Sequence, residues 1–359
     1  MKLAEVCPYS VSVPGGVQGQ VLALSRSMRN LGHEVDVVAP CDEPTVVDEI
    51  VALGRTHEWW ANGSLAPISI SPKMWGRLRG IFSHNSYDIV HLHEPFTPFV
   101  GVATMALSDA PVAGTFHRSG ASAIYKAYAR SLGVLSGRLE LRFAVSEEAR
   151  STAYAVTGRD SLVVGNGVDL TRFSSVAPWR KDAFTVMFIG RHEPRKGLEI
   201  LLEAFRYLDL THEIELWVAG DGPESLKLRA KYKKDPRIKW LGRVSEAEAA
   251  ARMRASDVVV APSLFGESFG VVLLEAMACK SVVVASNIDG YRELVRHRVD
   301  GILVPPGDPT ALASVIYEVI HSKDMAATLT ENALAKAETY SIDGLAKRYL
   351  DSFTEQLNG

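Results

Sequence analysis

The sequence predicts an α/β protein built from two Rossmann-like domains, each with a parallel sheet. The chain has 359 residues, a length typical of about two domains, and 47% of them are hydrophobic, which is enough for large cores. In both halves, short β-branched runs of strand length alternate with stretches of helical periodicity. This alternation is typical of βαβ units, in which helices cover both faces of a parallel sheet.

The first half contains four apolar runs that predict buried strands, at residues 3–7, 34–39, 88–92 and 111–116. Between the first two runs, apolar residues recur at helical spacing: Val21, Leu24, Met28 and Leu31. We therefore expect residues 1–168 to form the first Rossmann-like domain.

The same rhythm starts again at Thr185, with the strand-like runs TVMFIG, EIELWVAG, DVVVAP, SVVVAS and GILVPP. Glycine, proline and polar residues replace the apolar rhythm over residues 165–181, so we place the boundary close to Asp169 and the second domain at 169–340. Leu345, Tyr349 and Phe353 are spaced four apart in the tail, residues 341–359. This spacing predicts an amphipathic helix that needs a surface to cover.

Composition excludes several classes of protein. The formal net charge is only −3, so no general attraction to nucleic acid is expected. The three cysteines are few and lie in or beside apolar runs, which favours free thiols in a reducing compartment. Glu5 interrupts the apolar N-terminal run, and no stretch of 18 apolar residues occurs, so we expect a cytoplasmic protein without a signal peptide or a membrane-spanning helix.

A glycine-containing loop, residues 12–20, follows the first predicted strand. Gly15 and Gly16 lack a β-carbon, so the backbone can approach a phosphate closely at the start of the next helix. The dinucleotide fingerprint is incomplete, because Pro14 stands where its first glycine belongs and no acidic residue ends the second strand. An NAD site is therefore disfavoured, and a structural tight turn explains this loop as well as a diphosphate contact does.

The segment GRHEPRKG, residues 190–197, follows the first strand of the second half and brings Arg191, Arg195 and Lys196 to its carboxyl end. Cations fixed there can hold a diphosphate and stabilise the negative charge that it gains as a leaving group. A solvated basic turn is the alternative interpretation.

The segment GESFGVVLLE, residues 266–275, supplies Ser268, Phe269 and Gly270 where a helix is expected to begin, and free amide groups at that point suit phosphate oxygens. Glu275 follows Gly270 by five residues, or about 7 Å along the helix axis, which is close to the span from a diphosphate to a ribose. Glu267 precedes the helix, on the side where a carboxylate can hold sugar hydroxyls. Alternatively, Glu267 is a helix N-terminal charge and Glu275 an exposed helix residue.

Together these segments resemble the GT-B glycosyltransferases of the retaining family 4 group, whose signature is two glutamates separated by seven residues, here Glu267 and Glu275. Six segments carry the resemblance in the family's order: VCPYSVSVPGGVQ, VHLHEPFTP, GTFHRS, GNGVD, GRHEPRKG and GESFGVVLLEAMA. Within the family the chain is most similar to mannosyltransferases that act on phosphatidylinositol. The resemblance implies two Rossmann-like domains facing across a cleft, a GDP-mannose donor, a phosphatidylinositol-type lipid acceptor, no metal cofactor, and work at the inner face of the plasma membrane.

The resemblance also implies roles for particular residues. The catalytic set is His117, Glu267, Arg191 and Lys196. Donor contacts are expected from Gly15, Gly16, Arg191, Lys196, Val244, Glu267, Ser268, Phe269, Gly270 and Glu275. Acceptor contacts are expected from Tyr9, Gln18, His91, His93, Arg118 and Arg195.

On the acceptor side the chain departs from these mannosyltransferases. Ser122 stands where a basic residue is usual, and residues 66–68 replace an arginine that usually follows the NGS motif at 62–64. A related family 4 transferase with a UDP- or ADP-sugar donor or a soluble acceptor therefore remains an alternative. A binding protein that has lost catalysis and an NAD enzyme are disfavoured by the retained glutamate pair and the incomplete glycine fingerprint.

Two further features allow more than one interpretation. His91, His93 and Glu94 form an H-x-H-E string at a strand end, and alternation puts both imidazoles on one face, which superficially suits a divalent metal. No third ligand to join the two imidazoles is apparent nearby, so we prefer an acceptor pocket or core packing and predict no metal site. Residues Lys73–Phe82 predict an amphipathic helix with basic residues beside an aromatic apolar face. This helix either docks on anionic lipid or covers the first sheet.

Overall fold

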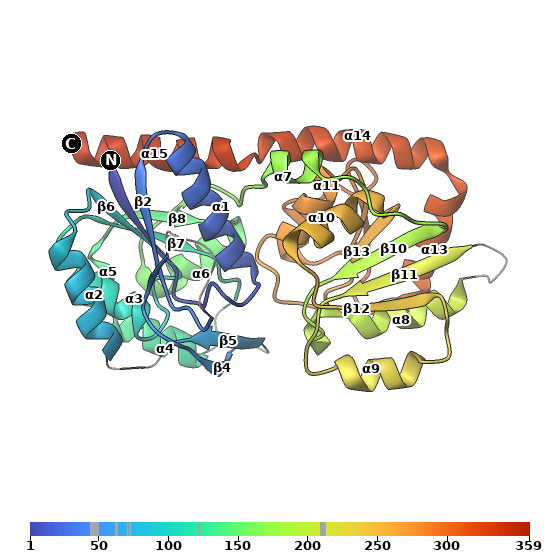
Figure 1. The fold of residues 1–359 in the computed structure, drawn as a ribbon, viewed down its shortest axis with the longest axis horizontal. Helices are drawn as coiled ribbons and strands as arrows, with labels where there is room; N and C mark the ends of the chain where they lie inside the picture. The colour runs from blue at the N-terminus through green and yellow to red at the C-terminus, as the bar shows by residue number, and fades with distance from the viewer. Residues whose placement is uncertain (44–49, 62–63, 70, 72, 121–122, 209–212) are drawn as a thin grey trace. The chain divides into compact units, whose positions relative to one another are not determined.

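The computed structural model describes residues 1–43, 50–61, 64–69, 71, 73–120, 123–208 and 213–359. The chain forms two compact units. The first comprises Met1–Gly167 and Ile342–Gly359, and the second comprises Val168–Ser341. Each unit has its own parallel sheet and its own cores (Figure 1), so the predicted α/β class with two Rossmann-like folds is confirmed.

The sheet of the first unit has the strand order β3-β2-β1-β6-β7-β8-β9, and all its neighbouring strands are parallel. The strands are β1 (Lys2–Val6), β2 (Glu34–Ala39), β3 (Ile50–Ala52), β6 (Ile89–His93), β7 (Val112–Phe116), β8 (Leu139–Ala144) and β9 (Leu162–Val163). A separate antiparallel hairpin joins β4 (His57–Ala61) and β5 (Ser64–Ile68). The helices are α1 (Gly16–Asn30), α2 (Lys73–His84), α3 (Val100–Leu107), α4 (Ala123–Ser131), α5 (Gly133–Ser136) and α6 (Glu147–Thr157).

The C-terminal helix α15 (Ile342–Asn358) belongs to the first unit and packs against α1. Its apolar face, which includes Leu345, Tyr349 and Phe353, joins Leu24 and Met28 of α1 in one buried cluster. The predicted amphipathic helix therefore exists, and the surface that it covers is one face of the first sheet.

The sheet of the second unit has the order β12-β11-β10-β13-β14-β15, again with parallel neighbours throughout. The strands are β10 (Phe184–Ile189), β11 (Ile214–Ala219), β12 (Ile238–Gly242), β13 (Val258–Ala261), β14 (Val282–Ser286) and β15 (Ile302–Val304). The helical elements are α7 (Leu170–Ser175), η1 (Pro194–Lys196), α8 (Leu198–Tyr207), α9 (Ser225–Tyr232), α10 (Glu246–Ala255), α11 (Val271–Ala278), α12 (Asp289–Arg292), α13 (Pro309–His321) and α14 (Lys323–Thr339).

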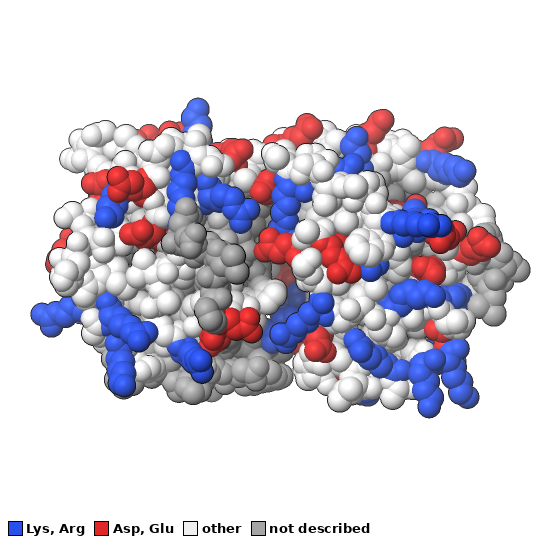
Figure 2. Space-filling model, in the orientation of Figure 1, with Lys and Arg blue, Asp and Glu red and all other residues white. Residues whose placement is uncertain are grey.

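Helix α2 contains the predicted amphipathic segment. Met74, Leu78 and Phe82 are buried in the core of the first unit, so the apolar face covers the fold. The outward face carries Trp75, which is 37% exposed, together with exposed Lys73, Arg77 and Arg79. Figure 2 shows basic side chains at the surface over this helix, in the lower left of the view. Any contact with lipid must therefore use this basic face rather than the aliphatic one.

The cysteines are free, with Cys7 and Cys279 buried. Among the described residues, no helix combines the length and apolarity needed to cross a bilayer.

Candidate functional site

In the second unit, the residues predicted to bind the donor gather at the carboxyl edge of the sheet. Strands β10 and β13 are neighbours although they are the first and fourth strands of this unit, so the chain reverses its direction across the sheet between them. Ligands of such sheets bind at this switch point. The loops after the two strands touch at Gly197, where a β-carbon would lie 2.0 Å from the carbonyl oxygen of Pro262. Because Gly197 also has φ +68°, only glycine fits this contact without strain.

The carboxylate of Glu267 is the centre of the cluster. Its Oε1 atom lies 2.9 Å from Nη1 of Arg195 and 2.6 Å from Nζ of Lys196. The hydroxyl of Ser263 also donates to Oε1, at 3.2 Å. Because the Glu267 side chain is only 12% exposed, its charge is held by these partners more than by water. Arg195, predicted to contact the acceptor, lies against the predicted sugar-binding carboxylate.

A second carboxylate, Glu193, fixes the guanidinium groups beside it. Its Oε1 atom lies 3.1 Å from Nε of Arg191, and its Oε2 atom lies 3.2 Å from Nε of Arg195. The Glu193 side chain is 1% exposed. Such a buried carboxylate orients both arginines before any ligand binds. Glu193 is not among the residues predicted from the sequence, where its one signal is an acidic residue inside a basic segment.

Helix α11 begins directly after this cluster. Gly270 is its N-cap at φ +90°, and a β-carbon there would meet the ring of Tyr291 at 2.9 Å. The amide groups of the first helical turn lack intrahelical partners, as at every helix start. Ser268 is half-buried, while Phe269 is buried and stacks edge-on against Tyr340, with ring centroids 5.7 Å apart. Phe269 can therefore offer a ligand its backbone rather than its ring.

Glu275 lies on α11, half-buried, and its side chain has no hydrogen-bond or ion-pair partner among the residues that the structure describes. Burial raises the pKa of its carboxyl group to about 7, although the positive charge of Arg172 opposes the shift. Arg172 is itself paired with Glu246, at 3.4 Å. An unpaired carboxylate in this setting is suited to hydroxyl donors from a ligand. Val244, one of the predicted donor contacts, is half-buried just beyond the carboxyl end of β12.

In the first unit, the glycine loop leads into α1. Gly15 is the N-cap of this helix, and both Gly15 and Gly16 are exposed. A β-carbon on Gly15 would lie 2.4 Å from the side-chain oxygen of Gln18, whereas one on Gly16 would meet nothing within 4 Å. A β-carbon at position 15 would therefore displace the Gln18 amide, whereas Gly16 leaves open space at the start of the helix.

Three histidines lie at the switch point of the first sheet, between β1 and β6. His91 and His93 are on β6, and His117 directly follows β7. His93 Nδ1 lies 2.9 Å from His117 Nε2, and the carboxylate of Glu5 on β1 contacts both strand histidines at 2.9 Å. His91 has no exposed surface, and both its ring nitrogens already have protein partners. His91 therefore offers a ligand neither exposed surface nor a free ring nitrogen, and its acceptor contact stays a prediction. The same holds for His93, which is 1% exposed and has a partner at each ring nitrogen.

The other predicted acceptor residues are partly enclosed. Gln18 is buried and donates to the carbonyl oxygen of Ser10 at 3.4 Å. Tyr9 is half-buried, and burial raises the pKa of its hydroxyl group. The guanidinium group of Arg118 stacks on the ring of Tyr125, 4.0 Å from its centroid. Ser122, where the chain departs from the family pattern, and residues 62–63 of the NGS motif lie outside the described residues.

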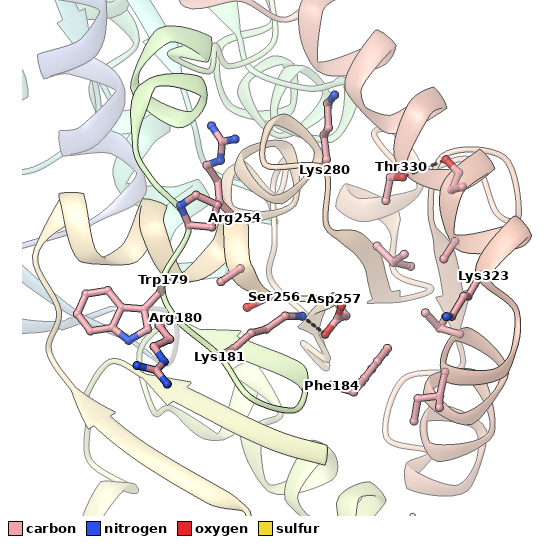
Figure 3. Close-up of a pocket in the computed structure, with 17 residues that line it drawn as sticks. Trp179, Arg180, Lys181, Phe184, Arg254, Ser256, Asp257, Lys280, Lys323 and Thr330 are labelled. Atoms are coloured by element: carbon pink, nitrogen blue, oxygen red, sulfur yellow. Dashed lines mark hydrogen bonds and ion pairs between the residues drawn. The ribbon is translucent and has the colours of Figure 1, made fainter. Parts of the chain in front are cut away.

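A surface pocket of about 710 Å³ lies elsewhere in the second unit (Figure 3). Phe184 and Val282, at the amino ends of β10 and β14, line it, and Lys181 is ion-paired there with Asp257. The pocket is thus at the opposite edge of the sheet from Glu267, where parallel α/β folds do not place their ligand sites.

Family comparisons agree with this geometry. Residues 171–336 match the family described as Glycosyl transferases group 1, and residues 14–172 match Glycosyltransferase Family 4. The chain is 36% identical over 335 residues to the phosphatidyl-myo-inositol mannosyltransferase of Mycobacterium leprae, covering 90% of this chain and 88% of the relative. It is 33% identical over 354 residues to the protein of the same name from Mycolicibacterium smegmatis, covering 95% and 90%.

Solved structures show the same fold at lower identity. Anabaena Alr3699/HepE in complex with UDP-glucose superposes with a TM-score of 0.81 at 21% identity, covering 99% of this chain and 100% of the other. Sucrose-phosphate synthase from Thermosynechococcus elongatus gives 0.78 at 20%, covering 99% of each chain. The two parallel sheets, the glutamate pair on the second and these comparisons lead to one conclusion: the chain belongs to the GT-B glycosyltransferases of family 4, beside the phosphatidyl-myo-inositol mannosyltransferases.

Proposed function

We propose that this glycosyltransferase transfers mannose from GDP-mannose to a phosphatidylinositol-type lipid, with retention of the anomeric configuration and without a metal cofactor. The observation that carries the proposal is the cluster at the second sheet's carboxyl edge, where Arg195 and Lys196 share the carboxylate of Glu267. The names of the relatives supply the sugar and the acceptor class, since several of them are called phosphatidyl-myo-inositol mannosyltransferase.

On this proposal, the donor diphosphate binds between the first turn of α11 and the cations that follow β10. As the bond from the anomeric carbon to the phosphate oxygen breaks, the leaving diphosphate gains negative charge. Arg191 and Lys196 then stabilise that charge. Their attraction for it is stronger in a partly buried site than in water. The guanidinium group of Arg191 is already oriented by Glu193, so little reorganisation is needed.

Glu267 and Glu275 contact different parts of the donor, the sugar and the ribose. Glu267 holds hydroxyl groups of the sugar and balances the positive charge that develops at its anomeric carbon. Glu275 accepts hydrogen bonds from the ribose hydroxyls. His117 is the remaining member of the proposed catalytic set and is proposed to contact the sugar. In a front-face reaction the acceptor hydroxyl attacks from the leaving-group side and gives its proton to a donor phosphate oxygen, so the protein need not supply a separate base.

The acceptor is proposed to reach the enzyme at the inner face of the plasma membrane. The outward face of α2 combines an exposed tryptophan with Lys73, Arg77 and Arg79, a combination that suits an anionic lipid surface. Tyr9, Gln18 and Arg118 remain the proposed acceptor contacts in the first unit.

Two observations favour a second candidate. HepE, which shares the fold, is described in complex with UDP-glucose, and Ser122 stands where the mannosyltransferases usually carry a basic residue. A transferase with a UDP-linked donor or a soluble acceptor is therefore the alternative.

A donor panel separates the two candidates. The protein is incubated with GDP-, UDP- and ADP-sugars, with and without phosphatidylinositol vesicles, and products are followed by mass spectrometry. We expect one hexose on the inositol lipid with GDP-mannose alone. Transfer from a UDP-sugar instead supports the alternative, and no transfer from GDP-mannose to the lipid refutes the proposal.

A further inference from the structure

Glu5 and His91 form a buried polar cross-strand pair in the middle of an apolar sheet. They are register partners on β1 and β6, the two strands at the switch point of the first unit. Both side chains have no exposed surface. The Glu5 carboxylate uses one oxygen for each histidine of β6: Oε1 lies 2.9 Å from His91 Nδ1, and Oε2 lies 2.9 Å from His93 Nε2. A buried carboxylate with two such partners is a costly feature that packing alone does not require.

The contacts continue from His93 to His117, at the carboxyl ends of β6 and β7. His93 Nδ1 lies 2.9 Å from His117 Nε2, so the carboxylate is linked through one imidazole to a second. His117 is half-buried, and its Nδ1 atom has no hydrogen-bond partner among the described residues. The main chain is held as well, because the amide group of His117 donates to the carboxylate of Glu94.

The direction of each hydrogen bond follows from the carboxylate. An ionised carboxylate can only accept, so His93 must carry its proton on Nε2. Neutral His93 then has a lone pair on Nδ1, which must accept from His117. The proton of His117 is thereby fixed on Nε2, and its Nδ1 atom is left as an acceptor.

The charge states agree with this assignment. Burial alone would raise the pKa of Glu5, but the charge of His91 and hydrogen bonds from both imidazoles lower it to about 2. Burial, aided by the neighbouring His91, lowers the pKa of His93 to about 4. Burial and the two other histidines lower the pKa of His117 well below its usual range. At neutral pH the chain from Glu5 through His93 to His117 therefore consists of a carboxylate and two neutral imidazoles.

We propose that Glu5 is a positioning residue: through His93 it fixes the tautomer of His117, so that His117 presents Nδ1 as a hydrogen-bond acceptor for a hydroxyl group of the sugar substrate. The sugar as partner rests on the proposed function, whereas the tautomer rests on the first unit alone. A histidine fixed in this way accepts a hydroxyl proton and cannot donate to a sugar oxygen from the same nitrogen, which selects one hydroxyl orientation.

The same three side chains, Glu5, His91 and His93, are of the types that bind metal ions, and their donor atoms lie within 4.8 Å of one another. A metal ion would have to displace the ring protons from His91 Nδ1 and His93 Nε2, both of which already have an oxygen partner at 2.9 Å. Each of these atoms already has a hydrogen-bond partner, so the structure favours the hydrogen-bonded chain from Glu5 to His117 over a metal site.

The test is long-range ¹H–¹⁵N correlation NMR of the ¹⁵N-histidine-labelled full chain at neutral pH, which distinguishes the two neutral tautomers and the imidazolium. We expect Nε2–H forms for both His93 and His117, unchanged by a chelator. An Nδ1–H form or an imidazolium at His117 overturns the proposal, as does a spectrum of these histidines that changes when the chelator removes a metal.

Variants then test the role of Glu5. In Glu5→Leu nothing accepts from His93, so its proton should move to Nδ1 and that of His117 to Nδ1 as well. Glu5→Gln is the second variant, used if Glu5→Leu fails to fold, because glutamine keeps the shape of the side chain. Its amide NH₂ faces one of the two imidazoles. Either His91 or His93 must then give up the proton on the facing nitrogen. Unchanged proton positions at both histidines in Glu5→Gln contradict the proposal.

Thr115→Val is the matched control, because the Thr115 hydroxyl lies 2.7 Å from His91 Nε2 and His91, rather than His93, connects it to the Glu5 carboxylate. This variant should leave the His117 tautomer unchanged. With a donor that the wild type transfers, Glu5→Leu should lower kcat about ten-fold, the loss of roughly one hydrogen bond, and Thr115→Val by less than about two-fold. A wild type that transfers no sugar defeats the proposed function but not the tautomer, and a wild type that transfers sugar with Nδ1–H His117 defeats only this inference.

Discussion

Nζ of Lys196 lies 2.6 Å from Oε1 of Glu267, and Nη1 of Arg195 lies 2.9 Å from the same oxygen. One carboxylate thus pairs with two cations, of which the proposed mechanism assigns Lys196 to a diphosphate. In this arrangement the cations are held in place before the donor arrives, and the carboxylate competes for them with the phosphate oxygens.

Glu267→Gln should separate donor binding from transfer. The variant keeps the shape but frees Arg195 and Lys196 from a negative charge, so GDP should bind as tightly as to the wild type or more tightly. Transfer should fall about 10²–10³-fold, because the sugar loses its charged partner in the transition state. Calorimetry with GDP and steady-state rates measure the two effects. Loss of GDP binding, or transfer at the wild-type rate, would contradict the assigned role.

Lys196→Ala should weaken both steps. Removing a cation from the leaving diphosphate should lower kcat/KM about 10²-fold and also weaken GDP binding. Lys323→Ala is the control, since Lys323 is an exposed lysine of the same unit at the pocket of Figure 3, away from the Glu267 edge. Equal losses in the two variants would remove the argument for Lys196.

Glu275 should give nucleotide binding a pH dependence. Burial raises the pKa of its carboxyl group from 4.5 to about 7, and the ribose hydroxyls need the ionised form as an acceptor. GDP affinity in the wild type should therefore increase as pH rises from 6 to 8, while Glu275→Gln should bind about ten-fold more weakly at pH 8 without this slope. Calorimetry at several pH values provides the comparison. A slope that persists in the glutamine variant assigns the titration to another group.

The same shift predicts a stability effect of defined sign. Between about pH 4.5 and about 7 the folded protein holds a proton on Glu275 that the unfolded chain releases. The free energy of unfolding therefore falls as pH rises through this window, by on the order of 2 kcal/mol after allowance for partial exposure, and is level above it. Denaturation of the wild type and Glu275→Gln at pH 5 and 8 checks this. The wild type should lose more stability than the variant between the two pH values; equal losses contradict the shift.

Gly290→Ala should damage the loop that carries Glu267. A β-carbon at position 290 would lie 1.9 Å from the backbone oxygen of Glu267, so the loop must move. We expect a lower Tm and at least ten-fold slower transfer. The control is Gly76→Ala, since Gly76 is exposed within α2 and a β-carbon there meets nothing within 4 Å. That change should be neutral or stabilise the protein by up to about 1 kcal/mol. A Gly290→Ala protein with unchanged Tm and rate would show that the contact can relax freely.

The basic face of α2 should bind anionic lipid. Arg77→Glu combined with Arg79→Glu should weaken binding to phosphatidylinositol-containing vesicles at least ten-fold, because each basic residue near such a surface contributes about 1 kcal/mol. Arg180→Glu with Lys323→Glu changes the net charge equally at exposed positions of the second unit and is the control. Vesicle co-sedimentation measures both. Unchanged binding by the α2 variant would rule this face out.

The fold was predictable because both sheets are built from continuous apolar runs. Each of the four runs predicted in the first half is a strand, and the tail is a helix. The strands that escaped prediction, such as β3, β8 and β12, are short or interrupted by charged residues, as in LELRFA. They pair at or toward the sheet edges, where one face tolerates polar side chains.

The candidate site was only partly predictable. The residues around Glu267 follow from sequence order, since parallel strands bring their carboxyl ends together. The roles of Glu193 and Glu5 do not follow, because a glutamate that is buried by tertiary packing has no local signature in the chain. His91 shows the same limit: alternation predicted its face of the strand, and only the packing of α15 over that face shows that no ligand can reach it.

The central claim is that the Glu267 cluster directs mannosyl transfer from GDP-mannose to an inositol lipid. The most direct measurement follows phosphatidylinositol by mass spectrometry after incubation with GDP-mannose and either the wild type or Glu267→Gln. We expect the wild type to add one hexose to the lipid and the variant to form at most a trace of this product. An unmodified lipid with the wild type, or equal product from both proteins, would contradict it.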